Sequence, residues 1–478
     1  MVSARHLAWM TLMDIYRGAY ADVALHNHLR NISLQENDRA LATELVYGCV
    51  RRQYTLDTLI QQLSSKPQPP SPDLRAMLHL GLYQLRYLSH IPPAAAVHST
   101  VELCKALKVS YGVGFVNAVL RHYLRLQAAE SEVLQLPSNP LDRLGVLHSY
   151  PRWILEVWAT QLQIGNLQTE GLQTGGLQTG DIETGSLAPE TLEDLEKLCE
   201  WLNTPPRLDL RVNPLRATVD QVRRALSQGG IEAEPIPGLP QGLALPGAIG
   251  AIPQLPGFQE GQWMVQDRSA QLVSHWLDPQ PGETIVDACA APGGKTLHLA
   301  ELMQNQGKIF AYDRTASRLK KLEQNLKRLG LTSVQVCQGD SRHQPDLKGQ
   351  CDRVLVDAPC SGLGTLHRHA DARWTQTPET IQDLSQLQGE LLRSAATWVK
   401  PGGVLVYATC TLHPAENEDQ IERFLQDHPH WTIELPPIAL AASGVPWALS
   451  PTVPSKGLKL WPHQAHMDGF FMVRLRHD

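Results

Sequence analysis

Several features that define special classes of protein are absent from this sequence. No apolar run approaches the ~18 residues of a membrane-spanning helix, so we expect no membrane partner. The opening residues MVSARHLAWM lack an apolar segment followed by a small-residue cleavage site, so export is not expected. The eight cysteines are irregularly spaced and none forms a CxxC pair, which argues against a zinc ribbon and a disulfide framework. Together these absences predict a cytoplasmic protein without a bound metal.

The length and charge indicate a multidomain globular protein. At 478 residues the chain is too long to fold around one hydrophobic core, so two or three domains are expected. The net charge of −6 gives no general sign of nucleic-acid binding, but residues 1–130 carry 13 Lys and Arg against 9 Asp and Glu. A basic module on an acidic body fits a polyanionic partner, and an ordinary solvated helical surface fits the same charges.

Residues 1–136 are predicted to form an all-α domain. Apolar side chains recur at helical spacing in several stretches, for example Ala42, Leu45, Val46 and Cys49, and prolines interrupt the series at 66–72 and 92–93. Residues 137–262 read as a small α/β connector. Within it, residues 165–186 repeat Leu-Gln-Thr with a period of five and contain no Lys or Arg, which favours a flexible surface insertion over a β-turn stack.

Residues 263–478 alternate between short apolar strands and helices, which predicts a Rossmann-like, doubly wound parallel sheet and hence an α/β fold. Ligands of such sheets bind at the carboxyl ends of the strands. The expected strands are 284–288, 308–313, 334–338, 353–357 and 403–409, and the expected helices include 317–330 and 377–399.

A glycine turn, DACAAPGGKT, follows the first of these strands. Gly293 and Gly294 let the backbone approach a ligand closely, and a helix N-terminus follows them. The turn resembles a phosphate-binding loop, GxxxxGK[ST], but Cys289 stands where the first glycine belongs. A purely structural turn is a further possibility.

Acidic residues at successive strand ends favour a nucleoside cofactor without a phosphate chain. Asp313 ends the second strand, where an acid bonds ribose hydroxyls in dinucleotide folds, and Asp340 follows the third, where it could bond an adenine amino group. Acids around the loop disfavour a polyphosphate and suit the cationic sulfonium of S-adenosylmethionine. Each acid taken singly is more often a solvated residue at a strand end.

A pair of cysteines follows the last two predicted strands. Cys360 lies in DAPCSGLGT and Cys410 lies in ATCTLHPAENE. Because consecutive parallel strands are usually neighbours, both thiols should face one crevice beside the glycine turn. A lone cysteine is more often a small buried apolar residue, but two at equivalent strand ends favour a functional site.

Two thiols suit methylation of a pyrimidine at carbon 5, which is a poor nucleophile. Thiolate addition at carbon 6 makes the ring an enamine, and carbon 5 then attacks the sulfonium methyl group. The carbon-5 proton and the thiol must afterwards leave, so one cysteine attacks and a second serves release. Asp357, in the same crevice, is a candidate to bond the cytosine edge and support protonation of ring nitrogen 3.

The motifs DACAAPGGKT, DAPCSGLGT, ATCTLHPAENE and DGFFMVRL together resemble the RNA cytosine-5 methyltransferases of the Nol/Nop2/Sun group, over nearly all of residues 263–478. The resemblance implies that Cys410 is the nucleophile, that Cys360 assists release, and that S-adenosylmethionine is the cofactor. In DNA cytosine-5 methyltransferases the PC motif supplies the nucleophile, so by that analogy Cys360 would attack. The implied cofactor-binding residues are Cys289, Ala290, Ala291, Pro292, Gly293, Gly294, Lys295, Asp313, Asp340 and Asp357.

The helical region resembles the RNA-binding NusB fold in IPPAAAVHSTVELCKAL and GFVNAVLRHYLR. A NusB-like domain joined to this catalytic type is the layout of bacterial 16S ribosomal RNA cytosine-5 methyltransferases. The resemblance therefore implies 16S rRNA, or a small-subunit assembly intermediate, as the partner, with no DNA. A monomer is expected, because nothing indicates a dimerisation face.

An RNA substrate must present its base from a loop or a flipped position, because a thiol cannot reach carbon 6 inside a duplex. The basic and aromatic candidates for RNA contact are Arg39, Arg51, Arg52, Arg121 and Arg125, then Arg368, His369, Arg373 and Trp374, and finally Lys456, Lys459 and His463. Two other functions remain open: a P-loop-like nucleoside triphosphatase, and a non-catalytic RNA-binding factor with a decayed methyltransferase domain.

Overall fold

The computed structural model describes residues 2–64, 68–107, 109–129, 131–169, 187–247, 250–434 and 457–478. They divide into two compact units, one of Met1–Thr204 with Leu366–Gln376 and one of Pro205–Thr365 with Thr377–Asp478. The chain thus leaves the second unit after Thr365 and returns at Thr377. The three-part division at 136 and 262 stays a prediction from the sequence.

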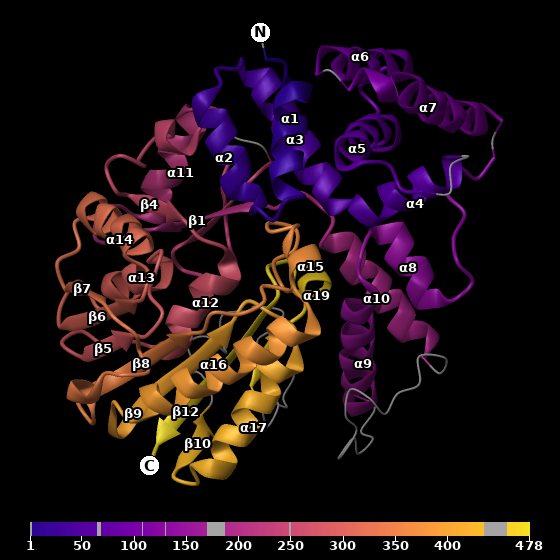
Figure 1. The fold of residues 1–478 in the computed structure, drawn as a ribbon. Coiled ribbons are helices and arrows are strands. Elements are labelled where there is room, and N and C mark those ends of the chain that lie inside the picture. The colour runs from indigo at the N-terminus through magenta and orange to yellow at the C-terminus, as the bar shows by residue number, and fades with distance from the viewer. Residues whose placement is uncertain are drawn as a thin grey trace. The chain divides into compact units, whose positions relative to one another are not determined.

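The described part of the first unit is helical, as the sequence predicts for its first 136 residues (Figure 1). Its helices are α1 (Ala4–Ile15), α2 (Ala21–Asn31), α3 (Glu36–Arg51), α4 (Gln53–Leu63), α5 (Pro72–Tyr87), α6 (Pro93–Ala106), α7 (Val113–Ala128), α8 (Pro140–His148), α9 (Arg152–Thr169), α10 (Pro189–Trp201) and α15 (Ala372–Thr375). Proline begins α5, α6, α8 and α10, where its missing N–H has no helical partner to lose.

Apolar stripes of these helices form one core. The predicted face of α3 is fully buried at Ala42, Leu45, Val46 and Cys49, and it packs with leucines of α1, α4 and α5. Helix α9 continues through residue 169, so the first five residues of the expected insertion are helical. Residues 170–186 of that insertion lie outside the described residues, as does Lys456.

Segment 366–376 is bound into the helical unit by side-chain hydrogen bonds. Arg373 is fully buried, and its guanidinium lies 4.3 Å from the ring centre of Tyr150. Asp371 accepts from the Ala21 N–H at the start of α2, and the Trp374 indole N–H donates to the Val50 carbonyl. Arg373 donates to the carbonyls of Arg51, Ser149 and Leu366 and to Asn203 Oδ1.

Two of the predicted RNA contacts, Arg51 and Arg373, are therefore wrong, whereas the half-buried Trp374 stays a prediction. Arg51 and Arg373 are buried, and Arg51 donates to the His367 carbonyl within the same unit. Trp374 packs against the helical core. The side chains of Arg51 and Arg373 donate to backbone carbonyls within the helical unit, a use that a count of basic residues does not reveal. Arg39, Arg121 and Arg125 are exposed and stay candidates.

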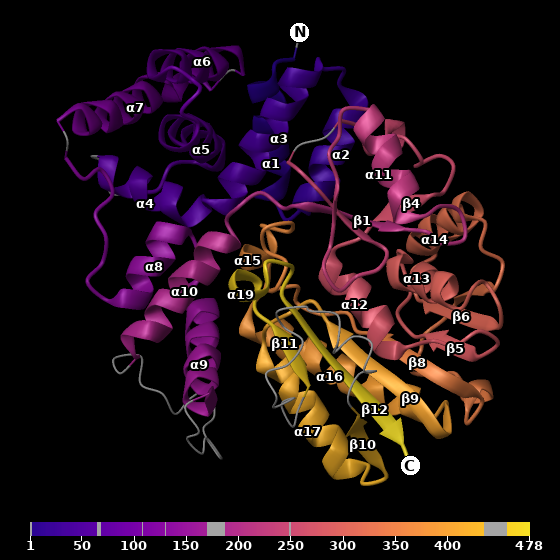
Figure 2. The same ribbon diagram turned by 180° about the vertical axis from the view of Figure 1, so that it is seen from behind.

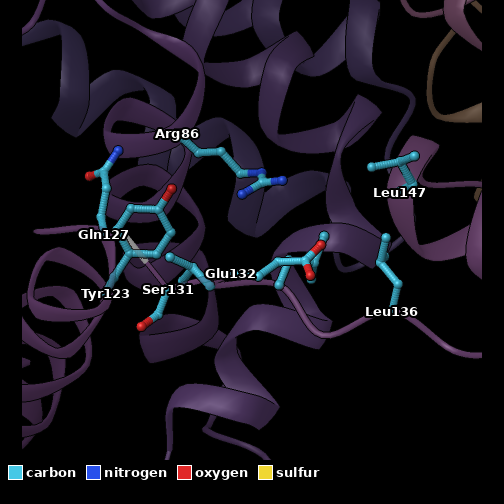
Figure 3. A pocket seen from close by; sticks show the side chains of 9 residues that line it. Arg86, Tyr123, Gln127, Ser131, Glu132, Leu136 and Leu147 are labelled. Carbon is cyan, nitrogen blue, oxygen red and sulfur yellow. The ribbon is translucent and has the colours of Figure 1, made fainter. Parts of the chain in front are cut away.

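The helical unit also contains a cavity of about 290 Å³ (Figure 3). Its lining residues come from α5, α7, α8 and the segment between α7 and α8: Arg86, Tyr123, Gln127, Ser131, Glu132, Val133, Leu134, Leu136 and Leu147. None of the predicted catalytic or cofactor-binding residues lines it. No helix among the described residues is long and apolar enough to cross a membrane.

A small antiparallel sheet opens the second unit, in the region predicted as the α/β connector. Its strand order is β2-β3-β1-β4. The elements are β1 (Leu208–Val212), α11 (Val219–Gln228), β2 (Glu234–Pro235), β3 (Gly242–Leu245) and β4 (Trp263–Val265). Because β4 pairs with β1, residues 263–265 belong to this sheet.

The main sheet has the order β10-β12-β9-β8-β5-β6-β7, with β11 paired to β12. Strands β9, β8, β5, β6 and β7 are parallel, as predicted, whereas β12 runs antiparallel to β9. The bounds are β5 (Thr284–Asp287), β6 (Lys308–Asp313), β7 (Val334–Gln338), β8 (Cys351–Asp357), β9 (Val399–Thr409), β10 (Trp431–Glu434), β11 (Leu458–Leu460) and β12 (Phe470–His477). The five predicted strands and the Rossmann-like fold class are thus confirmed.

Helices cover both faces of this sheet, and the layers can be followed in Figures 1 and 2. Ile285 and Leu355 face one apolar cluster, and their neighbours Val286 and Val354 face the other, because successive strand residues point to opposite faces. One cluster contains α12 (Arg268–Leu277), α13 (Gly294–Leu302) and α14 (Ala316–Leu329); the other contains α16 (Pro378–Ala396) and α17 (Glu418–Asp427). A short helix, α19 (Pro462–Ala465), precedes β12.

Arg373→Met is expected to lower the free energy of unfolding of the helical unit by about 2–4 kcal/mol, because several buried acceptors lose their donor. Urea denaturation followed by circular dichroism measures this loss. The matched control is Arg125→Met, in an exposed position of α7. Equal stability of the two variants would contradict a structural role for Arg373.

Candidate active site

Four carboxylates lie at or just after the carboxyl ends of neighbouring parallel strands. Asp287, Asp313 and Asp357 are the last residues of β5, β6 and β8, and Asp340 follows β7 by two residues. In the order β8-β5-β6-β7 they line one edge of the sheet. This is the edge at which open α/β sheets bind ligands.

Asp287 stabilises the glycine turn between β5 and α13 by hydrogen bonds. This buried carboxylate accepts from the Thr296 hydroxyl at 2.6 Å and from the Cys289 N–H at 3.3 Å. Gly293 has φ +110°, and a Cβ there would lie 2.5 Å from the Leu322 side chain, so glycine is required twice over. Burial raises the pKa of Asp287 to about 7 and that of Cys289 well above its usual value.

Arg211 of β1 supports the same turn from the small sheet. Its fully buried guanidinium donates to the Gly294 carbonyl at 2.8 Å and to Gln266. It also forms an ion pair with Glu301 of α13, with both N–O contacts at 2.8 Å. Neither Arg211 nor Asp287 was among the predicted site residues. Asp287 opens the motif DACAAPGGKT, so the sequence offered a signal for it, whereas Arg211 lies in a distant strand and carries no motif of its own.

The two acids expected to contact the cofactor have different surroundings. Asp313 is 8% exposed and accepts from the Thr315 N–H at 2.8 Å, and Arg318 lies 3.4 Å from its other oxygen. Asp340 is bonded through both oxygens to Arg342, which lowers the pKa of Asp340 to about 2. Carboxyl oxygens at these two positions are hydrogen-bond acceptors, which fit ribose hydroxyls, an adenine amino group and a cationic sulfonium.

The lysine of the glycine turn does not serve as a phosphate ligand here. Lys295 Nζ donates to Asp357 Oδ2 at 2.7 Å and lies 5.0 Å from the ring centre of Phe470. Burial acts to lower the pKa of Lys295, but the Asp357 carboxylate outweighs it and raises the value. Because a phosphate-binding loop needs this lysine on the phosphates, the ion pair disfavours the nucleoside triphosphatase.

The two cysteines lie together, as their strand positions predict. Strands β8 and β9 pair in parallel with Asp357 opposite Ala408, and Cys360 Sγ lies 3.4 Å from Cys410 Sγ. The hydrogen bond to Cys410, burial and the nearby charge of Glu416 raise the pKa of Cys360 well above its usual value.

Close backbone contacts hold the Cys360 loop. The Gly364 N–H donates to the Cys410 carbonyl at 3.0 Å. On its other side, a Cβ on Gly364 would lie 2.2 Å from the Gly469 carbonyl oxygen, so the loop passes β12 only because residue 364 is glycine. The DGFFMVRL motif, which the sequence offered only as part of a resemblance, thus packs directly on the Cys360 loop.

Comparisons with known proteins agree with this arrangement. Residues 274–476 match the 16S rRNA methyltransferase RsmB/F family, residues 2–125 the NusB family, and residues 189–251 the ferredoxin-like domain of RsmF/B-like methyltransferases. The probable ribosomal RNA small subunit methyltransferase B of Synechocystis sp. is 47% identical over the full length of both chains. The chain belongs to the ribosomal RNA small subunit methyltransferase B family.

Solved structures of similar fold extend to both units. The protein PH0851 is 28% identical, with a TM-score of 0.73 over 99% of this chain and 98% of its own. NSun6 from Pyrococcus horikoshii, solved with SFG, is 25% identical, with a TM-score of 0.54 over 60% of this chain and 95% of its own. As a member of the methyltransferase B family, this chain is an S-adenosylmethionine-dependent methyltransferase, and the NusB-like helical domain is confirmed.

Asp287→Asn is expected to flatten the dependence of stability on pH. A carboxyl with a native pKa of about 7 binds a proton that the unfolded chain releases near pH 4, so its contribution to stability is complete below about pH 4 and is lost as the pH rises through about 7. Thermal melts from about pH 5 to about pH 7.5 measure the slope. Asp427→Asn, at an exposed carboxyl, should match wild type; an unchanged slope in Asp287→Asn would contradict the prediction.

Proposed function

We propose that this protein transfers the methyl group of S-adenosylmethionine to carbon 5 of a cytosine in 16S rRNA, through a covalent bond between Cys410 and the cytosine. The observation that carries the proposal is the pair of thiols, 3.4 Å apart and adjoining the Lys295–Asp357 ion pair through β8. One thiol can form the covalent bond while the other handles a proton, which a single cysteine could not do at the same site.

The cofactor is assigned to the carboxylate edge of β5, β6 and β7. When bound there, S-adenosylmethionine supplies an electrophilic methyl group on a cationic sulfur. Asp313 is proposed to bond the ribose hydroxyls and Asp340 the adenine amino group. The turn itself, formed by Cys289, Ala290, Ala291, Pro292, Gly293, Gly294 and Lys295, offers backbone groups for close approach, and Asp357 adds negative charge.

Cys410 is assigned the attack. Its thiolate forms a bond to carbon 6, and the electron pair of the C5=C6 double bond moves to carbon 5, which takes the methyl group as the methyl–sulfur bond breaks. Asp357 is proposed to hold the cytosine edge during this step. Lys295 Nζ donates to Asp357 Oδ2 at 2.7 Å and orients that side chain. The raised pKa of Cys360 supports this order, because a thiol that retains its proton is the poorer nucleophile.

Cys360 is assigned the release. Once it has lost its own proton to solvent, its thiolate accepts the proton from carbon 5, the C5=C6 double bond re-forms, and the Cys410 sulfur leaves as a thiolate. Atoms and charge balance, and both cysteines return to their starting forms after proton exchange with water. The high proton affinity of the Cys360 sulfur suits a group that removes a proton from carbon.

The substrate part of the proposal rests on relatives that act on small-subunit ribosomal RNA. The NusB-like unit supplies exposed arginines, such as Arg121 and Arg125 on α7, for contact with RNA phosphates. We propose 16S rRNA, free or in a small-subunit assembly intermediate, as the partner of a monomeric enzyme in the cytoplasm. Another RNA would use the same chemistry.

Cys360→Ala should accumulate a covalent protein–RNA species with small-subunit rRNA and S-adenosylmethionine, because attack proceeds and release is blocked. Cys410→Ala should form none. A denaturing gel separates the species. Cys351→Ala, at a buried cysteine of β8, is the matched control and should behave as wild type. The reverse pattern would exchange the roles of the two thiols. If neither variant forms an adduct and the wild-type protein transfers no methyl group, the proposal is contradicted and the protein is a non-catalytic RNA-binding factor.

S-adenosylhomocysteine at about a hundredfold excess over its Kd should raise the melting temperature of the protein by about 3 °C or more, and ATP with magnesium should leave it unchanged. Asp313→Asn should weaken the shift, because it removes a charged acceptor from the proposed ribose site. A shift with ATP alone would contradict the cofactor assignment.

A further inference from the structure

A buried glutamate connects the two cysteine loops. Glu416 lies in the short 3-10 helix Pro414–Glu416 that follows the Cys410 loop, and its side chain has no exposed surface. The carboxylate accepts from the Ser361 N–H at 2.9 Å and from the Ser361 hydroxyl at 2.5 Å. Ser361 is the residue directly after Cys360, so the carboxylate of one loop holds the backbone of the other.

Further hydrogen bonds extend this network to both thiol-bearing segments. The Ser361 hydroxyl lies 2.7 Å from the hydroxyl of Thr411, the residue directly after Cys410. Gln388 of α16 donates to Glu416 Oε1 and to the Pro359 carbonyl, both at 2.9 Å. The Tyr407 hydroxyl donates to the Glu416 carbonyl at 2.6 Å. Glu416 is thus bonded through its carboxylate to the Cys360 loop and α16, and through its backbone carbonyl to β9, and the residues before and after Cys360 both belong to the network.

An ionised carboxylate in a buried site is costly, so its retention needs a reason beyond packing. Burial raises the pKa of Glu416, while hydrogen bonds from the hydroxyl and N–H of Ser361 and from the side chains of Gln388 and Thr411 act to lower it. The charge lies close enough to Cys360 to raise the pKa of that thiol. On the other side of the pair, Asp357 raises the pKa of Lys295 against the effect of burial, and Cys410 contributes a smaller effect in the same direction.

We propose that Glu416 is the positioning residue of the cysteine pair: through Ser361 and Thr411 it holds the two loops in one geometry, and its carboxyl group beside the Cys360 loop makes the surroundings of the two thiols unequal, so that Cys410 attacks. This inference rests on the proposed function only in assigning the attack to Cys410. The other ionisable groups that act on the pair are Lys295 and the buried phenol of Tyr407, whose pKa is raised well above its usual value by burial, so that it stays neutral.

Two substitutions separate the charge from the hydrogen bonds. In Glu416→Gln the amide oxygen still accepts from the Ser361 N–H and from Gln388, and the amide nitrogen donates to the Ser361 hydroxyl, which then donates to Thr411. The network survives and the charge is lost. In Glu416→Ala both are lost. Glu418→Gln is the matched control, because Glu418 lies two residues away and its carboxylate pairs with Lys459 at 2.8 Å.

The first measurement is alkylation of Cys360 by iodoacetamide as a function of pH, in a Cys410→Ala background, with the modified peptide identified by mass spectrometry. Glu416→Gln should shift the midpoint for Cys360 by about one pH unit to lower pH, because a nearby negative charge has been removed. Glu418→Gln should not shift it. An unshifted midpoint in Glu416→Gln, with the fold intact by circular dichroism, would overturn the assignment of the charge.

The second measurement is methyl transfer in the Cys410 enzyme. Glu416→Gln should lower kcat about tenfold and Glu416→Ala about a hundredfold, with the KM for S-adenosylmethionine within about twofold of wild type. Glu418→Gln should match wild type. A change confined to KM, or wild-type kcat in Glu416→Gln, would overturn the positioning role.

The two proposals fail separately. Alkylation requires neither RNA nor cofactor, so a shifted Cys360 midpoint in a protein that methylates no cytosine would support Glu416 and contradict the proposed substrate chemistry. An adduct pattern as proposed, with Glu416→Gln equal to wild type in both measurements, would do the opposite.

Discussion

The active site depends on the parallel pairing of β8 with β9. Their register places Asp357 opposite Ala408, so both strands end at the same edge and their following loops begin side by side. Cys360 lies three residues after Asp357, and Cys410 lies two residues after Ala408. Because the two loops begin side by side, the sulfurs lie 3.4 Å apart although 50 residues separate them in the chain. A slip of the register would turn alternate side chains to the other face and separate the thiols.

Three ionisable side chains lie around this pair of cysteines, and each comes from a different element. Lys295 comes from the cofactor turn, Asp357 from the strand that precedes Cys360, and Glu416 from the helix that follows Cys410. Each is buried or half-buried and each has a named partner, so that the glycine turn, the Asp357 carboxyl and the two thiols share one edge of the sheet. Arg211 connects the small sheet to the glycine turn by donating a hydrogen bond to the Gly294 carbonyl.

The helical unit contains a segment that sequence reasoning gave to the catalytic domain. Residues 366–376 begin directly after the Cys360 loop, yet Arg373 and Asp371 are bound by helical-unit partners. The chain between β8 and α16 thus passes through both units before it returns to the sheet. In the sequence, a buried arginine that donates to backbone carbonyls cannot be told from an exposed arginine that binds RNA. For this reason the prediction that Arg373 contacts RNA was wrong.

The sequence by itself determined the parallel sheet, the strand ends at which Asp313, Asp357, Cys360 and Cys410 stand, and the helical character of the first region, because hydrophobic periodicity and turn residues are local signals. Only the tertiary structure decided which buried polar groups support the site. Asp287, Arg211 and Glu416 act through partners distant in the chain or across a loop, and all three are buried, which no local pattern encodes. The motif ATCTLHPAENE already contained Glu416; what the sequence lacked was the contact with Ser361 that gives this carboxylate its role.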